Sequence, residues 1–177
     1  MKNLVFYTML AVMVVLSSCE TSNTDEVLQD EAALKSGKKV MNFRAHLSGD
    51  QEAPPNESIA QGQAIFQLSK DGTELSYKLI VANIDNVRMA HIHVGAAGTN
   101  GPVRVWLYPS APPMMVIPGT TNGILAEGVI TAANLLGPLA GQPLSALVEL
   151  MQAGNTYVNV HTDAYPPGEI RGQIFGN

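Results

Sequence analysis

The chain has 177 residues, enough for one domain that buries a substantial core, together with short appendages. Only 14% of the residues are charged, while there are 16 glycines and 11 prolines, a composition that favours a β-rich, turn-rich extracytoplasmic domain over a helical cytosolic one. The net charge is −5 and there is no basic run, so nucleic acid is excluded as an expected partner.

The N-terminus predicts an export signal over residues 1–18. A short positive start precedes a continuous apolar run at 4–16, which is too short for a membrane span of about 20 residues but suits the core of a signal peptide. The stretch L-S-S-C then ends at Cys19 and resembles the lipobox of bacterial lipoproteins, in which the cysteine is lipidated. The alternative is an ordinary cleaved signal peptide in which Cys19 is incidental.

Cys19 is the only cysteine of the chain, so its position indicates a lipid attachment point better than a disulfide or a metal ligand. Residues 19–39 are then the lipidated cysteine and a polar tether, and residues 40–177 are the folded domain. The expected partner of the N-terminus is a membrane, since each buried lipid methylene contributes roughly 0.8 kcal/mol. We expect an extracytoplasmic protein anchored to the bacterial envelope at the outer membrane, on its periplasmic or its surface face.

From residue 40 onward, apolar and polar residues alternate in short runs that predict β-strands. Asp71-Gly72 predicts the turn of a hairpin between two of these runs, and residues 109–119 predict a long irregular loop. The strands expected in this part of the chain cover residues 43–47, 61–68, 75–81, 89–94, 103–108 and 124–130.

The last third of the chain holds the one clear helix signal, at 143–152. It has proline at its first position, apolar residues at helical spacing, and Gly154 past its end. A shorter helical turn is expected over 132–136. Strands at 156–162 and 169–175 complete a set of seven or eight, which predicts an antiparallel sandwich.

The segment A-H-I-H-V-G at 90–95 places His91 and His93 on one face of a strand, about 7 Å apart at Cα. His161 lies in the later segment Y-V-N-V-H-T. If the two strands are neighbours, three imidazoles could ligate one ion, with Met89 or water as a fourth, weaker ligand. Imidazoles with a thioether suit copper, whereas three imidazoles and a water suit zinc equally well.

A structural role for the histidines, in which they bond turn backbones at the edge of the sandwich, is the alternative. If a metal is present, Asp163 or Glu169 is expected to accept a hydrogen bond that orients a ring. Asn159 shares the face of His161 and is a further candidate for orientation or recognition. Glu169 and Arg171, at i and i+2, could form a recognition pair, a structural salt bridge, or a pin for the P-P-G turn.

Several segments in order resemble the CHRD (chordin-type) domain: F-R-A-H-L-S-G-D-Q-E-A-P-P, G-Q-A-I-F-Q-L, L-S-Y-K-L, A-H-I-H-V-G, N-G-P-V and Y-V-N-V-H-T…P-G-E-I-R-G-Q. The resemblance covers residues 41–175. It implies an all-β fold, an antiparallel Greek-key β-sandwich of immunoglobulin-like or Cu,Zn-superoxide-dismutase-like shape, here with one short helix near 143–152. The family is mostly known as an extracellular module without an assigned reaction, so the resemblance implies little about activity.

We therefore expect a non-catalytic binding or interaction domain at the cell envelope, with an envelope protein or a polysaccharide as its partner. The alternatives are a copper- or zinc-binding protein that uses His91, His93 and His161, and a structural envelope component. Enzyme activity is not expected, because residues 40–177 contain no G-x-S-x-G elbow and no cysteine. Superoxide dismutase activity is not expected either, since that enzyme needs a disulfide and more histidines than the four present.

Overall fold

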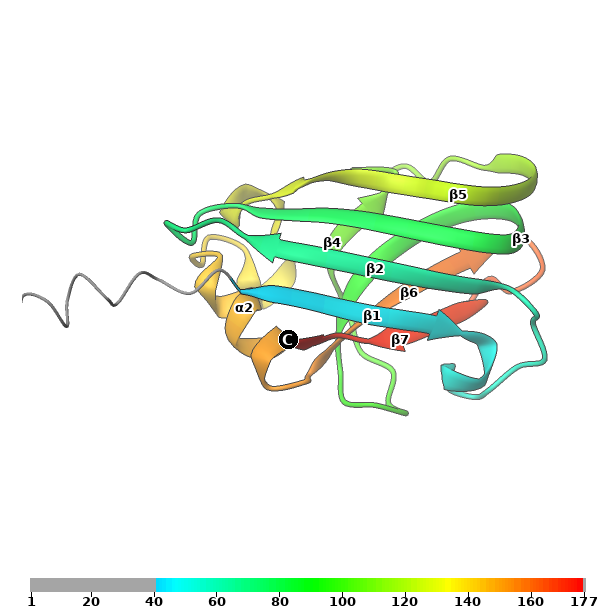
Figure 1. Ribbon diagram of the computed structural model, residues 1–177, viewed down its shortest axis with the longest axis horizontal. Coiled ribbons are helices and arrows are strands. Elements are labelled where there is room, and N and C mark those ends of the chain that lie inside the picture. The colour runs from blue at the N-terminus through cyan, green and yellow to red at the C-terminus, as the bar shows by residue number, and fades with distance from the viewer. Residues whose placement is uncertain (1–40, 177) are drawn as a thin grey trace, which may run out of the picture. The chain divides into compact units, whose positions relative to one another are not determined.

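The computed structural model describes residues 41–176 (Figure 1). The expected signal peptide, Cys19 and the tether lie outside the described residues, so the structure leaves those predictions untested. No helix within 41–176 is long and apolar enough to cross a membrane.

Strands dominate the described chain, and a single α-helix accompanies them. The strands are β1 (Asn42–Ser48), β2 (Gln61–Leu68), β3 (Leu75–Val94), β4 (Val103–Tyr108), β5 (Ile117–Ile130), β6 (Thr156–Thr162), β7 (Ile170–Gln173) and β8 (Phe175–Gly176). The helical segments are η1 (Gly49–Gln51), η2 (Ala132–Asn134), η3 (Gly137–Leu139) and α2 (Ser145–Gln152). The all-β class and the single short helix near 143–152 are thus confirmed.

The strands form one antiparallel sheet that closes into a barrel. β1 pairs with β2, β2 with β3, β3 with β6, β6 with β7, and β7 with β1. β4 and β5 extend this ring along β3, and β8 pairs with β1. Figure 1 shows β5, β3, β2 and β1 side by side, with α2 at one end of the barrel. The antiparallel pairing is as expected, whereas the Greek-key sandwich and its immunoglobulin-like detail stay predictions.

The longest strand, β3, belongs to both sides of the barrel. Its pairing with β2 ends at Ala82, and its pairing with β6 begins at Val87. Between them, Asn83 and Asn86 adopt positive φ angles of 56° and 50°. Asparagine tolerates this left-handed conformation better than most residues, and the register against β5 shifts there. The resulting bend lets one strand pass from one set of neighbours to the other.

Two sequence expectations for this region were wrong. The runs at 75–81 and 89–94 were expected as separate strands, but they are the two halves of β3. The loop expected over 109–119 is shorter, because β5 begins at Ile117 and not at residue 124. In both places the extra strand residues pair in an irregular register, and an alternation pattern does not reveal such pairing.

The core lies inside the barrel and is built by the alternating residues of the strands. Along β2 the burial pattern alternates strictly, with Phe66 buried and its neighbour Ile65 exposed. The same alternation buries Phe43 and Leu47 of β1. Leu147 and other apolar residues of α2 close one end of this core.

We expect Phe66→Ala to lower the free energy of unfolding by about 3–5 kcal/mol, because it removes a fully buried ring from a packed interior. Ile65→Ala is the matched control: its side chain is 43% exposed, and we expect it to cost less than about 1 kcal/mol. Urea unfolding followed by the signal of the single tryptophan measures both. Equal losses would show that the register of β2 is wrong.

Candidate metal centre

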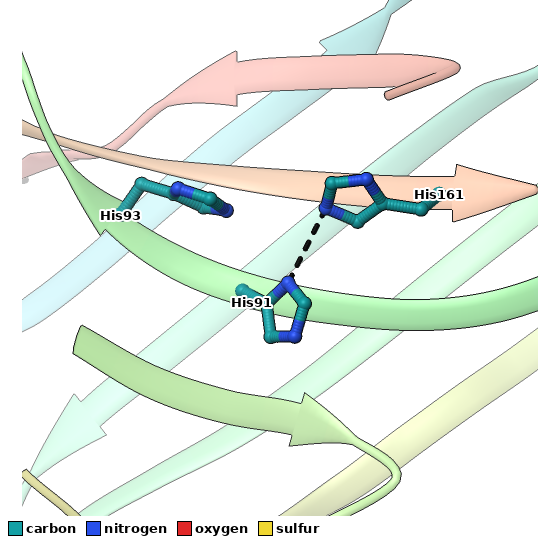
Figure 2. A group of neighbouring side chains, drawn as sticks. All are labelled: His91, His93 and His161. Carbon is teal, nitrogen blue, oxygen red and sulfur yellow. Dashed lines mark hydrogen bonds between the residues drawn. The ribbon is translucent and has the colours of Figure 1, made fainter. Parts of the chain in front are cut away.

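Three histidines from two neighbouring strands meet on one face of the sheet. His91 and His93 come from β3 and His161 from β6, and Figure 2 shows their rings turned toward one another. One ligand nitrogen from each ring can be chosen so that all three lie within 4.8 Å of one another. All three residues are buried, with exposed fractions of 3%, 8% and 7%. The predicted convergence of these rings is therefore present in the structure.

Backbone carbonyls fix the orientation of two of the rings. His93 Nδ1 lies 2.8 Å from the carbonyl oxygen of Gly101, and His161 Nδ1 lies 2.9 Å from that of Pro166. A carbonyl oxygen can only accept, so in both rings Nδ1 carries the proton and Nε2 carries a lone pair. This is the tautomer that a metal ligand bound through Nε2 requires.

One of the three nitrogen–nitrogen separations has the length expected for two ligands of one ion, and all three are within 4.8 Å. In a tetrahedral site with metal–nitrogen bonds of about 2.0–2.1 Å, two ligand nitrogens are about 3.3–3.4 Å apart. His91 Nδ1 and His161 Nε2 are 3.3 Å apart, and because the proton of His161 lies on Nδ1, His91 Nδ1 donates a hydrogen bond to His161 Nε2 (the dashed line in Figure 2). In addition, the Nε2 atoms of His91 and His93 are buried and have no hydrogen-bond partner among the described residues. The unpaired Nε2 of His93 is available as a ligand, whereas an ion bound through Nδ1 of His91 would leave the Nε2 of His91 protonated and still unpaired.

Burial keeps the three imidazole rings neutral by lowering their pKa values. Burial lowers the pKa of His91 to about 3, and the neighbouring His161 and His93 add to this effect. Burial likewise lowers the pKa of His93 to about 4, although the hydrogen bond to Gly101 acts in the opposite direction. Burial also lowers the pKa of His161. Imidazoles must be neutral to bind a metal, so at neutral pH this cluster is in the ligand form.

Aromatic side chains pack around the cluster. The ring of Trp106, on β4, meets His91 edge-to-face with the centroids 4.3 Å apart. Tyr157, on β6, stacks on His93 at 4.8 Å. Met89, the expected weak fourth ligand, pairs directly opposite His161 and is half-buried. Because directly opposed residues project on the same face, Met89 stands on the side of the sheet that carries the histidines.

A buried arginine holds the loop that follows the histidine strand. Arg171 is 1% exposed, and its guanidinium donates to the carbonyl oxygens of Ala96 and Thr99 and to Asn100 Oδ1, at 2.8–3.2 Å. The same group lies 3.4 Å above the ring centroid of Tyr157. Its planar fork therefore satisfies three acceptors of loop 95–101 from two separate nitrogens, a geometry that the single nitrogen of a lysine does not match.

Two further side chains fasten the same loop. Gln173 Nε2 donates to the carbonyl oxygens of Gly95 and Gly154, at 2.9 and 2.6 Å. The Gly101 N–H donates to the Tyr157 hydroxyl at 3.0 Å. At Gly101 any Cβ would collide with the carbonyl of Val94, so only glycine fits. The loop that supplies the partner of His93 is thus held from several sides.

Next to the cluster lies a buried carboxyl that the sequence analysis missed. Both oxygens of Glu52 accept from Asn159 Nδ2, at 2.9 and 3.2 Å, and Asn159 pairs with His91 across β3 and β6. Burial raises the pKa of Glu52 to about 7, although Arg171 and two hydrogen bonds lower it. A Cβ at Gly168 would collide with both side chains, so that glycine lets them meet. The only signal in the sequence was the D-Q-E-A-P-P segment, which gave Glu52 no role.

The residues expected to orient a histidine ring lie elsewhere. Asp163 bonds Arg88 at 2.9 Å, and its side chain is 48% exposed. Glu169 accepts from the hydroxyls of Ser58 and Thr162, both at 2.6 Å. The orienting acceptors are backbone carbonyls, which sequence reasoning does not reveal because every residue carries one.

Glu169 and Arg171 were expected as a possible pair. In the described chain no ion pair joins them, and each side chain forms hydrogen bonds with other groups. The carbonyl oxygen of Glu169 also accepts from Asn56 Nδ2 at 3.0 Å. Glu169 therefore links β7 to β6 and to the loop after η1, close to the P-P-G turn. Arg171 links β7 to loop 95–101.

An open cleft of about 580 Å³ lies beside this network. Glu52, Arg171 and Gln173 contribute to it from the buried polar layer. The full lining is Asp50, Gln51, Glu52, Ala53, Pro54, Pro55, Ala97, Gly98, Arg171 and Gln173.

Fold and site together define an all-β barrel domain with a buried cluster of three histidines beneath a fixed loop. The family model of the CHRD domain matches residues 43–174. The chain therefore belongs to the CHRD domain family, as its motifs suggested. No curated protein and no solved structure matched the chain.

We expect Arg171→Lys to lower the free energy of unfolding by about 2–4 kcal/mol, because buried carbonyls of the loop lose their donors. Amide hydrogen exchange should also accelerate within residues 95–101. Arg88→Lys, at the partly exposed ion pair with Asp163, is the control and should cost less than about 1 kcal/mol. Unchanged exchange in Arg171→Lys would contradict its role as the anchor of this loop.

The shifted pKa values predict loss of stability in acid. Below the ordinary histidine pKa of 6.5 the unfolded chain protonates His91 and His93, whereas the folded chain leaves them neutral until about pH 3 to 4. The folded state then binds fewer protons, so the free energy of unfolding falls as the pH falls through this window. Glu52 has the opposite effect on the free energy of unfolding. Between pH 7 and its ordinary pKa of 4.5, only the folded state keeps the carboxyl of Glu52 protonated, so this group stabilises the fold as the pH falls.

Urea unfolding between pH 7 and 4, with a chelator present, tests this balance. We expect the free energy of unfolding to fall less steeply with pH in His91→Gln than in the wild type, and more steeply in Glu52→Gln. A wild-type stability that is constant or rises on acidification would contradict the assignment of neutral buried imidazoles.

Proposed function

We propose that this CHRD domain is a non-catalytic metal-binding module of the bacterial envelope that holds one copper or zinc ion at His91, His93 and His161. The observation that carries the proposal is the cluster of three buried imidazoles, two of which have their Nδ1 fixed on backbone carbonyls. Burial keeps the rings of His91 and His93 neutral, and their Nε2 atoms have no hydrogen-bond partner among the described residues, which supports a role as ligands.

The surroundings support holding an ion more than turning over a substrate. Each histidine is less than a tenth exposed, and loop 95–101 is fastened by Arg171 and Gln173. A catalytic metal keeps an open position for water and substrate, whereas a bound or stored ion needs only its ligands.

Among the two metals, copper is favoured by charge and by ligand softness. Arg171 and Arg104 lie near enough to His93 to lower its pKa, so the site already contains positive potential. A singly charged Cu(I) ion is repelled less than Zn(II) by that potential. The thioether of Met89, on the same face, is a soft donor that suits Cu(I).

The proposed location is the envelope, through a lipid on Cys19. The L-S-S-C stretch after a short apolar run supports this anchoring, and residues 20–39 provide the tether. We expect the Cys19→Ala variant to lose its association with the membrane, and cell fractionation measures this.

Metal content and titration of the full chain, purified in detergent without a histidine tag, test the metal site. We expect one Cu(I) per chain, weaker Zn(II) binding, and an increase in thermal stability on loading. Replacing a residue that only orients a metal ligand weakens metal binding by roughly 10–100-fold. His93→Ala and His161→Ala remove ligands themselves, so each should weaken binding by more than that.

His46→Ala is the matched control, because His46 is an exposed histidine of β1 outside the cluster. It should leave both stoichiometry and affinity unchanged. Binding no tighter than that of a surface histidine pair, or equal losses in His46→Ala and His161→Ala, would refute the proposed site.

A further inference from the structure

Three segments of the chain line the cleft beside the histidine layer. They are η1 with the Pro54-Pro55 segment after it, the loop that holds Ala97 and Gly98, and strand β7, which contributes Arg171 and Gln173. The volume of the cleft, about 580 Å³, falls within the range of about 300–1,000 Å³ of small-molecule sites.

Gln173, which lines the cleft, carries an acceptor that has no partner within residues 41–176. Its Nε2 donates to two backbone carbonyls, and since carbonyls only accept, the amide orientation is fixed. Its Oε1 is therefore the free end, and it is buried without a partner among the described residues. Because Gln173 lines the cleft, a ligand donor that reaches this atom would complete its hydrogen bonding.

Glu52 and Arg171 both line the cleft, yet no ion pair joins them in the described chain. Arg171 donates to loop 95–101 through its two Nη nitrogens, at distances of 2.8–3.2 Å. The carboxyl of Glu52 accepts from Asn159 Nδ2 and from the backbone of Ala53. A ligand therefore meets acceptors from Asp50, Glu52 and Gln173, and one cation.

This lining disfavours charged ligands of either sign. An anion would be repelled by the exposed carboxylate of Asp50 and could not donate to Gln173 Oε1. An ammonium group would be attracted by Asp50, but it is repelled by Arg171 and has no lone pair with which to accept from the guanidinium. Hydroxyl groups both donate and accept, so a neutral ligand with several hydroxyls can satisfy the acceptors and the guanidinium together. The prolines offer an apolar wall for the C–H face of a sugar ring.

We propose that this cleft is a saccharide-binding site, formed by Asp50, Glu52, Arg171 and Gln173, that recognises neutral sugar hydroxyls. None of these residues belongs to the histidine cluster, so the site does not depend on the proposed metal function. In an envelope protein, such a site would dock the domain on glycan at the cell surface.

Saturation-transfer NMR on the full chain, in a detergent without a sugar headgroup, provides the test. The probes are D-glucose, D-galactose and N-acetyl-D-glucosamine, with acetate, ethanolamine and a neutral tripeptide amide as comparators. We expect at least one of the sugars to bind in the millimolar range, as single-ring ligands with few contacts do, and the comparators to bind more weakly.

Two variants localise the binding. Ala97→Trp fills the cleft from an exposed position and should abolish sugar binding, while Asp50→Ala should weaken it by about tenfold through loss of a charge-assisted hydrogen bond. The matched controls are Ala133→Trp on η2 and Asp85→Ala on β3, both exposed and outside the cleft. They should bind sugar like the wild type.

No sugar binding by the wild type, stronger binding of a charged comparator or of the tripeptide amide, or binding that survives Ala97→Trp would each overturn the proposal. Metal titration of Ala97→Trp separates the two sites, because that variant should still load the histidine cluster. Loss of sugar binding with intact metal binding supports two separate sites.

Discussion

The structure depends on one constraint: a polar layer is buried on the face of β3, β6 and β7, and its groups need partners within the protein. Leaving a buried donor or acceptor unpaired costs about 1–3 kcal/mol, so the loop over this layer must supply complementary groups. Arg171 meets most of that need, since it bonds two carbonyls and one side chain of loop 95–101 while lying over Tyr157. The atoms left unsatisfied are therefore informative. Among the described residues, they lie on His91, His93 and Gln173, where a metal ion and a ligand hydroxyl would supply partners, and also on Thr121, Thr156 and Asn159.

The barrel provides the rigid frame for this layer. β3 carries His91 and His93 in its second half, and its first half is fixed between β2 and β5. The bend at Asn83 and Asn86 therefore connects the half of β3 that pairs with β2 to the half that carries the histidines. Because β6 pairs with that second half, His161 comes close to the H-x-H pair without any mobile element. Such fixed geometry lowers the cost of ordering ligands when an ion binds.

Much of the site followed from the sequence, because strand periodicity places i and i+2 side chains on one face. That rule brought His91 and His93 together, and the assumption of neighbouring strands added His161. The rule failed where the backbone decides: the bend of β3 depends on two left-handed asparagines, and the rings are oriented by the carbonyls of Gly101 and Pro166 in place of Asp163. Glu52 was missed because it lies 39 residues before the nearest cluster histidine in the sequence, in a loop whose contacts alternation does not predict.

X-ray absorption spectroscopy at the copper edge, on the full chain loaded with one equivalent of Cu(I), tests the central claim most directly. The account predicts three nitrogen neighbours at about 2.0 Å with the outer-shell scattering of imidazole, and a sulfur contribution that disappears in Met89→Leu if the thioether is a ligand. A spectrum that shows fewer than two imidazoles, or one that is unchanged when His161 is replaced by alanine, would contradict the claim that the buried histidine layer is a metal site.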